Sequence, residues 1–150
     1  MSFQLKSHLF SRYGSFADKR IKKIDSGRNF IGDSRASGGI ASDGGLYGWF
    51  CGILIEVESD DEVRVLLSGD IPKSADVNAT MSALGGVPGA ARVQLTITKE
   101  NLPLLKRLAG EIAAIVAPGR HYATLSYKYM CPLTASSLNK LAGYLEEFWK

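Results

Sequence analysis

The sequence predicts one α+β domain: a four-stranded mixed sheet with the chain order β-β-β-α-β-α, two C-terminal helices on one face, and a basic N-terminal arm. A length of 150 residues is usual for a single domain and is enough to bury most of its apolar surface. Hydrophobic residues make up 45% and charged residues 22% of the chain, as in an ordinary globular protein. In some segments apolar residues alternate with polar ones, as in strands, and in others they recur at helical spacing. This mixture indicates the α+β class.

The N-terminal part of the chain is basic. Residues 1–42 hold eight Lys or Arg against three Asp, whereas the remainder holds ten against twelve acidic residues. Within residues 15–24, Ser15 and Asp18 resemble a capping box, and Ala17, Ile21 and Ile24 recur at helical spacing, so we expect a short helix. Residues 25–45 are rich in Gly, Ser, Asp and Asn and read as a linker. The chain therefore divides into an arm and linker (1–45) and a domain (46–150) that should fold without the arm.

The first three strands follow from alternation. Residues 49–58 and 62–67 are two apolar segments separated by a short acidic turn, which predicts an antiparallel hairpin. Residues 69–91 are rich in Gly, Pro, Ala and Ser and predict a long loop, or a weak helix over 75–84. Residues 92–98 alternate strictly, which predicts a strand with one wet face.

Two helices and one further strand complete the prediction. Residues 101–119 have leucine and isoleucine at intervals of three and four until Pro118 and Gly119, with Thr98 or Asn101 as the N-cap. Residues 120–130 read as a fourth strand, and residues 134–149 as an amphipathic helix. If the third and fourth strands join one sheet, they form a right-handed βαβ unit with the helix between them, which makes the sheet mixed.

Several classes of protein are excluded or disfavoured by composition. The most apolar stretch, 45–57, contains three glycines and is shorter than the ~20 residues of a spanning helix, so no membrane partner is expected. The N-terminus lacks the apolar segment of a secretory signal, and the two cysteines fit neither a disulfide framework nor a metal pattern. We expect a cytoplasmic protein of bacterial or phage type, with no metal and no cofactor.

The basic arm is the first candidate binding site. Cations neutralise phosphates and aromatic faces stack on unpaired bases, so basic residues interleaved with aromatics suit single-stranded nucleic acid or RNA. The alternative is a solvated arm whose aromatic residues dock onto the domain or onto a neighbouring subunit. The candidate residues are Lys6, Arg12, Lys19, Arg20, Lys22, Lys23, Arg28 and Arg35, with Phe10, Tyr13, Phe16 and Phe30 between and around them.

The second candidate lies in the predicted fourth strand. Tyr122 and Lys128 are an even number of residues apart, so in a strand they share one sheet face, as aromatic and basic residues do in RNA-recognition modules. The alternative is a wet strand face that collects Tyr, Thr, Ser and Lys without binding anything.

Cys131 is the only candidate for covalent chemistry. If it is the N-cap of the last helix and Pro132 the first helical residue, the helix dipole favours its thiolate. His121, however, lies ten residues back along an extended strand, roughly 33 Å away, so it is too distant to act as a base. No phosphate loop, zinc-protease motif or nucleophile elbow is present in the sequence.

These observations favour a non-enzymatic binding or accessory module that contacts nucleic acid through its arm. A protein partner or a homo-oligomer is also expected, because an arm of this kind can order on a neighbouring subunit. The alternatives are a self-assembling structural subunit and, third, a small thiol enzyme that uses Cys131.

Overall fold

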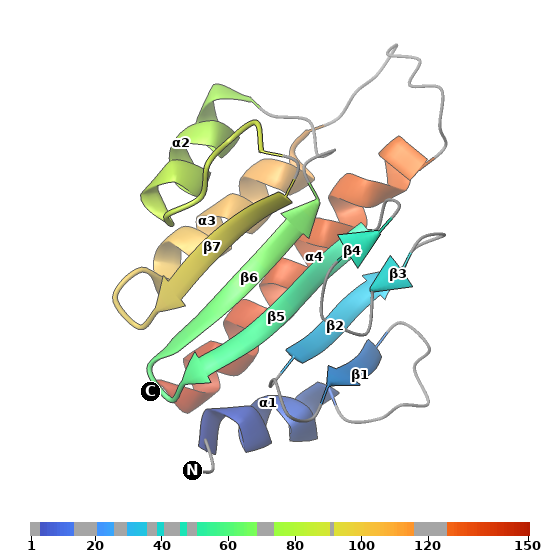
Figure 1. The fold of residues 1–150 in the computed structure, drawn as a ribbon. Helices are drawn as coiled ribbons and strands as arrows, with labels where there is room; N and C mark the ends of the chain where they lie inside the picture. Colours follow the sequence, from blue (N-terminus) through green and yellow to red (C-terminus); the bar gives the residue numbers. More distant parts are fainter. Residues whose placement is uncertain are drawn as a thin grey trace.

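The computed structural model describes residues 4–13, 21–25, 30–35, 39–40, 46–47, 51–68, 74–90, 92–115 and 126–150. These residues form an α+β fold with a layer of helices behind an antiparallel sheet (Figure 1). The helices are α1 (Gln4–Tyr13), α2 (Ala75–Ala83), α3 (Leu102–Ala113) and α4 (Ser126–Phe148). The main sheet has the order β1-β2-β5-β6-β7, with β1 (Ile21–Asp25), β2 (Phe30–Arg35), β5 (Cys51–Ser59), β6 (Glu62–Ser68) and β7 (Arg92–Thr98). A separate pair joins β3 (Gly39–Ile40) and β4 (Leu46–Tyr47).

The predicted hairpin and the predicted third strand are confirmed. β5 and β6 pair antiparallel around the turn at Asp60 and Asp61, and β7 adds to β6 along its whole length. Residues alternate between a buried and a wetter face, because successive side chains of a strand point to opposite sides of the sheet. The buried members belong to one core: Ile53, Ile55, Val57, Val63, Val65, Leu67, Val93, Leu95 and Ile97.

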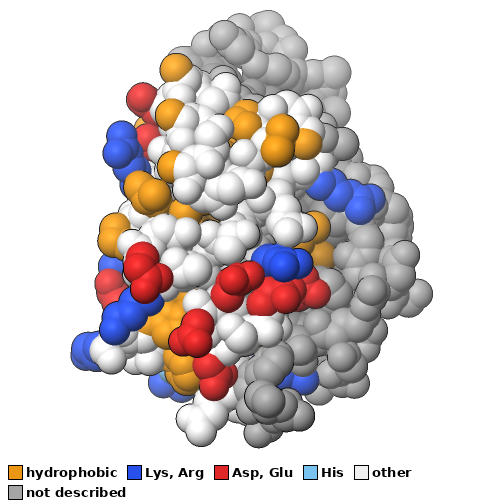
Figure 2. Space-filling view, turned by 60° about the vertical axis from the view of Figure 1, so that its left-hand side comes forward, with side chains coloured by type: hydrophobic (Ala, Val, Ile, Leu, Met, Phe, Trp, Pro, Cys, Tyr) orange, Lys and Arg blue, Asp and Glu red, His pale blue; other side chains and the backbone are white. Residues whose placement is uncertain are grey.

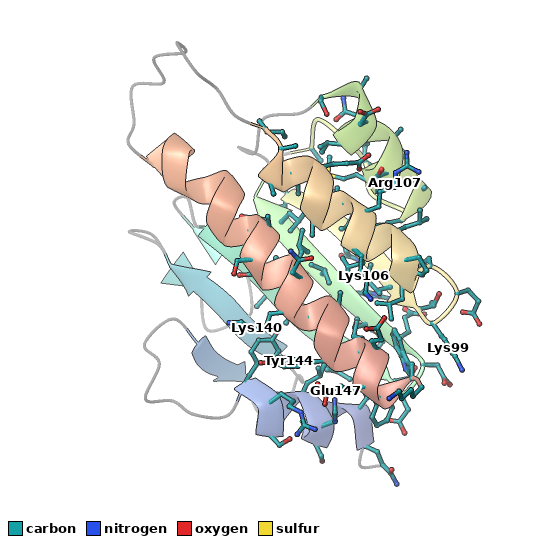
Figure 3. All side chains as sticks on the ribbon, turned by 180° about the vertical axis from the view of Figure 1, so that it is seen from behind. Lys99, Lys106, Arg107, Lys140, Tyr144 and Glu147 are labelled. Carbon is teal, nitrogen blue, oxygen red and sulfur yellow. The ribbon has the colours of Figure 1, made fainter. Side chains whose placement is uncertain are left out.

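The two predicted C-terminal helices are also confirmed, and both cover the same face of the sheet (Figure 3). α3 contacts α4 and β7, and α4 contacts β5. The leucines and isoleucine that recur at helical spacing are buried: Leu102, Leu105, Leu108 and Ile112 in α3, and Leu138, Leu141 and Leu145 in α4. Pro103 is tolerated because it lies in the first turn of α3, where its missing N–H costs no helical bond.

The weak helix expected over 75–84 is present as α2, and the turn after it closes the edge of β7. Ser74 caps α2, since its Oγ accepts a hydrogen bond from Val77 N at 3.1 Å. The chain then lies against β7 so closely that a Cβ on Gly86 would meet side-chain atoms of Val93 and Leu95 at 2.8 Å. Thr96 N donates to Leu84 O at 2.9 Å.

Asn101 closes the rest of this edge. Its Oδ1 accepts from Thr98 N and its Nδ2 donates to Thr96 O, both at 2.8 Å. The prediction placed Asn101 at the N-cap of α3, where it does lie, but its side chain bonds the strand rather than the helix. These contacts use up backbone groups that an added strand would need, so this part of β7 is protected against edge pairing.

The prediction for the N-terminal part is wrong where the structure describes it. Gln4–Tyr13 is a helix whose Leu5, Leu9 and Tyr13 are buried in the same core as the sheet, so it is not a free arm. Residues 21–25, expected in a short helix, form strand β1. Residues 30–35, expected in a linker, form β2, which pairs with both β1 and β5. Local periodicity could not reveal these strands, because distant segments supply their hydrogen bonds.

The predicted fourth strand is wrong over residues 126–130, which are the first five residues of α4. Residues 120–125 lie outside the described part of the chain. All strand pairs among the described residues are antiparallel, so the mixed sheet expected from a βαβ unit is replaced by an antiparallel one. The tyrosines of this segment favour strands only in a suitable setting, because β propensity depends on neighbours and burial.

Candidate functional site

The residues expected to bind nucleic acid lie on several different elements. Lys22 and Lys23 lie in β1, the last strand at one side of the sheet, and Arg35 is the final residue of β2. Lys128 lies near the beginning of α4 and so does not share a strand with them. Lys19, Arg20, Arg28 and Tyr122 lie outside the described residues. The structure therefore brings together the β1 and β2 members and separates Lys128, which corrects the sheet-face site predicted around Tyr122 and Lys128.

The pairing register fixes where the two lysines lie in the sheet. Lys22 pairs with Gly32 and Lys23 with Ile31, and these β2 residues pair in turn with Leu54 and Ile55 of β5. Among the described residues no strand pairs with the outer side of β1. The basic pair is thus at one side of the sheet, two strands from β5.

The β5–β6 hairpin is the acidic counterpart of this basic strand. Glu56 faces Arg64 across the two strands, and Arg64 also contacts Glu58 at 3.3 Å and Glu62 at 3.7 Å. These residues lie on the face opposite α3 and α4 and are partly exposed. Figure 2 shows carboxylates gathered around a basic group on this surface. Within this cluster the three glutamates outnumber the one guanidinium, so the cluster has a negative formal charge.

A second charged cluster joins α1 to α4. Arg12 binds Glu147 through Nη2 at 3.0 Å and through Nε at 3.2 Å. These hydrogen bonds hold the pKa of Glu147 below its usual value. His8 Nε2 lies 2.9 Å from Tyr144 O, and because a carbonyl only accepts, this ring nitrogen is the protonated one. Figure 3 shows Tyr144 and Glu147 on the side of α4 that faces α1.

Asp60 in the hairpin turn connects both ends of the chain. Its Oδ1 accepts from Leu5 N at 2.9 Å in the first turn of α1, and its carbonyl accepts from Trp149 Nε1 at 2.7 Å. A carboxylate at a helix N-terminus also interacts favourably with the helix dipole. The turn that looked like a solvated acidic loop in the sequence therefore anchors α1, and Asp60 has a structural role.

The sequence offered a signal for α1 that the prediction did not use. Leu5, Leu9 and Tyr13 recur at intervals of four, which places them on one side of a helix. Emphasis on the net charge of residues 1–42 obscured this apolar stripe. For the Arg64 cluster the signal was the predicted hairpin, which places Glu62 two residues from Arg64 on one strand and Glu58 on the strand beside it.

The helix-cap geometry proposed for Cys131 is not present. α4 begins at Ser126, so Cys131 is inside the helix and Pro132 is an interior residue. A thiol there is not at the N-terminus, where unbonded N–H groups would stabilise a thiolate. This removes the argument for a nucleophile at Cys131. Cys51 lies in β5, as expected.

No group of metal-ligating side chains is found in the part of the chain that the structure describes. Among the same residues, none of the helices has the length and apolar character to cross a bilayer. No protein-family model, no curated protein and no solved structure matches the chain.

Proposed function

We propose that this chain is a non-enzymatic binding module that contacts nucleic acid through the basic segment containing β1. The observation that supports this proposal is the position of Lys22 and Lys23 on the outermost strand of the sheet. Lysine ammonium groups neutralise phosphates and release bound counterions, which supplies sequence-independent affinity. Lys19 and Arg20 precede this strand in the sequence, and Arg28 and Arg35 flank or end β2. A cytoplasmic setting in a bacterium or phage-infected cell is part of the proposal.

The binding experiment compares the intact protein with a variant in which Lys19, Arg20, Lys22 and Lys23 are all changed to Ala. Fluorescence anisotropy with a labelled oligo(dT) is measured over a series of salt concentrations. Each lost contact to a single strand should flatten the slope of log affinity against log salt by about 0.7. Affinity should fall similarly for oligonucleotides of other sequence, because phosphate contacts position a protein without reading bases.

A matched variant separates local charge from net charge. Changing Lys99, Lys106, Lys140 and Lys150 to Ala removes the same number of charges from other parts of the chain and should leave most of the salt slope in place. Absence of binding by the intact protein at low salt would refute the proposal. An equal loss of affinity in both variants would also count against the proposal, because it would show that the phosphate contacts are not specific to the segment containing β1.

Self-assembly through the sheet is the second candidate. It is favoured by the lack of a strand partner on the outer side of β1 within the described residues, since an edge strand can pair with another chain. Adjacent lysines oppose such pairing between two copies, because like charges would face each other. Sedimentation of the protein alone distinguishes this candidate from nucleic-acid binding.

A further inference from the structure

The β5–β6 hairpin places carboxylates close to the basic strand. In the sheet register, Lys22 aligns with Gly32 and Leu54, and Glu56 is the next residue of β5 on the same face as Leu54. At about 4.8 Å per strand, β5 lies about 10 Å and β6 about 14 Å from β1 across the sheet. Glu58 and Glu62 follow at the hairpin end of these two strands.

These carboxylates lie on the face of the sheet that the described helices leave uncovered. Ile55 and Val57 are buried beneath the helices, so the intervening Glu56 and its neighbour Glu58 point to the other face. The side chains of Glu58 and Glu62 are 29% and 35% exposed, and Arg64 compensates only part of their charge. A polyanion that crossed this face from β1 would therefore meet repulsion after two strands.

We infer that the hairpin carboxylates Glu58 and Glu62 exclude nucleic acid from the hairpin end of the sheet and confine it to the side formed by β1 and β2. This inference rests on the proposed function and adds to it which part of the sheet the nucleic acid contacts. The distances from β1 to β5 and β6 are comparable with the Debye length, which is about 10 Å at 0.1 M salt and about 30 Å at 0.01 M. The exclusion is therefore strong at low salt and fades as salt increases.

The test is a double variant, Glu58→Gln with Glu62→Gln, that removes both negative charges. Its affinity is measured with the same labelled oligo(dT). Glutamine keeps the shape and polarity of the side chain while removing its charge. With several phosphates near the hairpin, affinity at about 0.01 M salt should rise about three- to tenfold, and the gain should shrink to about twofold or less at 0.1 M.

The matched control is Glu146→Gln with Glu147→Gln. These residues also pair with basic side chains, Lys106 and Arg12. They lie on α4, however, on the side of the sheet that the helices cover (Figure 3). The change in net charge is identical, so any gain that depends on total charge alone appears in both variants. The inference predicts that the control gains less than half as much as the hairpin variant.

The outcomes separate the two proposals. A larger gain in the hairpin variant supports the exclusion, provided that circular dichroism shows both variants folded. Equal gains in both variants, or no gain in either while the intact protein binds, would overturn the exclusion and leave the proposed function standing. A failure of the intact protein to bind oligo(dT) at 0.01 M salt would overturn both.

Discussion

The segment from β5 to α3 and the segment from α1 to β2 differ in how their structure is encoded. In the first, each element has its own periodic signal: strict alternation over β7 and intervals of three and four over α3. In the second, β1 and β2 are short and polar, and they exist as strands because β2 is paired on both sides. Local patterns therefore identify elements with a complete apolar face, whereas polar strands depend on contacts made across the sheet.

The largest effect is expected in the segment that the sequence predicts well. Leu141 is fully buried between α4 and the rest of the core. Leu141→Ala removes apolar contacts and leaves a cavity, so it should lower the free energy of unfolding by about 3–5 kcal/mol. Urea denaturation measures the loss. Asn139→Ala, at an exposed position of the same helix, should change stability by less than about 0.5 kcal/mol.

A smaller but clear loss is expected from α1, whose apolar stripe the prediction did not use. Leu9 of α1 is also fully buried in the core. Leu9→Ala should cost about 2–3 kcal/mol, in the lower part of the usual range, because a helix at the periphery can partly collapse onto the cavity. The exposed Ser7→Ala is the control. A loss at Leu9 no larger than that at Ser7 would mean that α1 is the free arm expected from composition.

The smallest effect concerns the ion pair that holds α1 to α4. Because Arg12 lowers the pKa of Glu147 in the folded protein, the pair stabilises above the usual glutamate pKa of about 4.5 and this contribution disappears as pH falls through the folded value. Both side chains are about half exposed, so the contribution is modest and sensitive to salt. The difference in stability between the intact protein and Glu147→Gln should be present at pH 7 and shrink as the pH falls below 4.5.

A stability difference between these two proteins that is unchanged at pH 3 would contradict an electrostatic role for Glu147. High salt offers an independent check at neutral pH, because screening weakens exposed ion pairs. A difference that persists in salt would point to packing of the glutamate stem against α1 instead of charge.

The sequence was sufficient for much of the fold because the well-predicted elements bury one whole face. The hairpin, β7, α3 and the last four turns of α4 follow from side-chain pattern alone. The first residues of α4 were misread because Tyr127 and Tyr129 suit a strand and because Pro132 is typical of a helix beginning. The segment containing Lys22 was misread because Ile21 and Ile24 match helical spacing in a segment too short to distinguish the two periods.

The candidate site was predictable only in its composition. The basic residues were identified from charge, but their place on β1 and β2 depends on pairing between segments. The carboxylates near them come from a hairpin more than twenty residues further along the chain. Their proximity is a property of the sheet order β1-β2-β5, which no local pattern in the sequence expresses.

The most direct test of this account is amide hydrogen exchange over β2. β2 is paired with β1 on one side and with β5 on the other, so the amides of Ile31, Gly32, Asp33 and Ser34 should all be hydrogen-bonded. The account predicts protection at these amides that approaches the protection of β5 and β6, because all of these strands open together with the core. Exchange at the rate of an unfolded chain across β2, with β5 and β6 protected, would contradict it and restore the basic arm and linker.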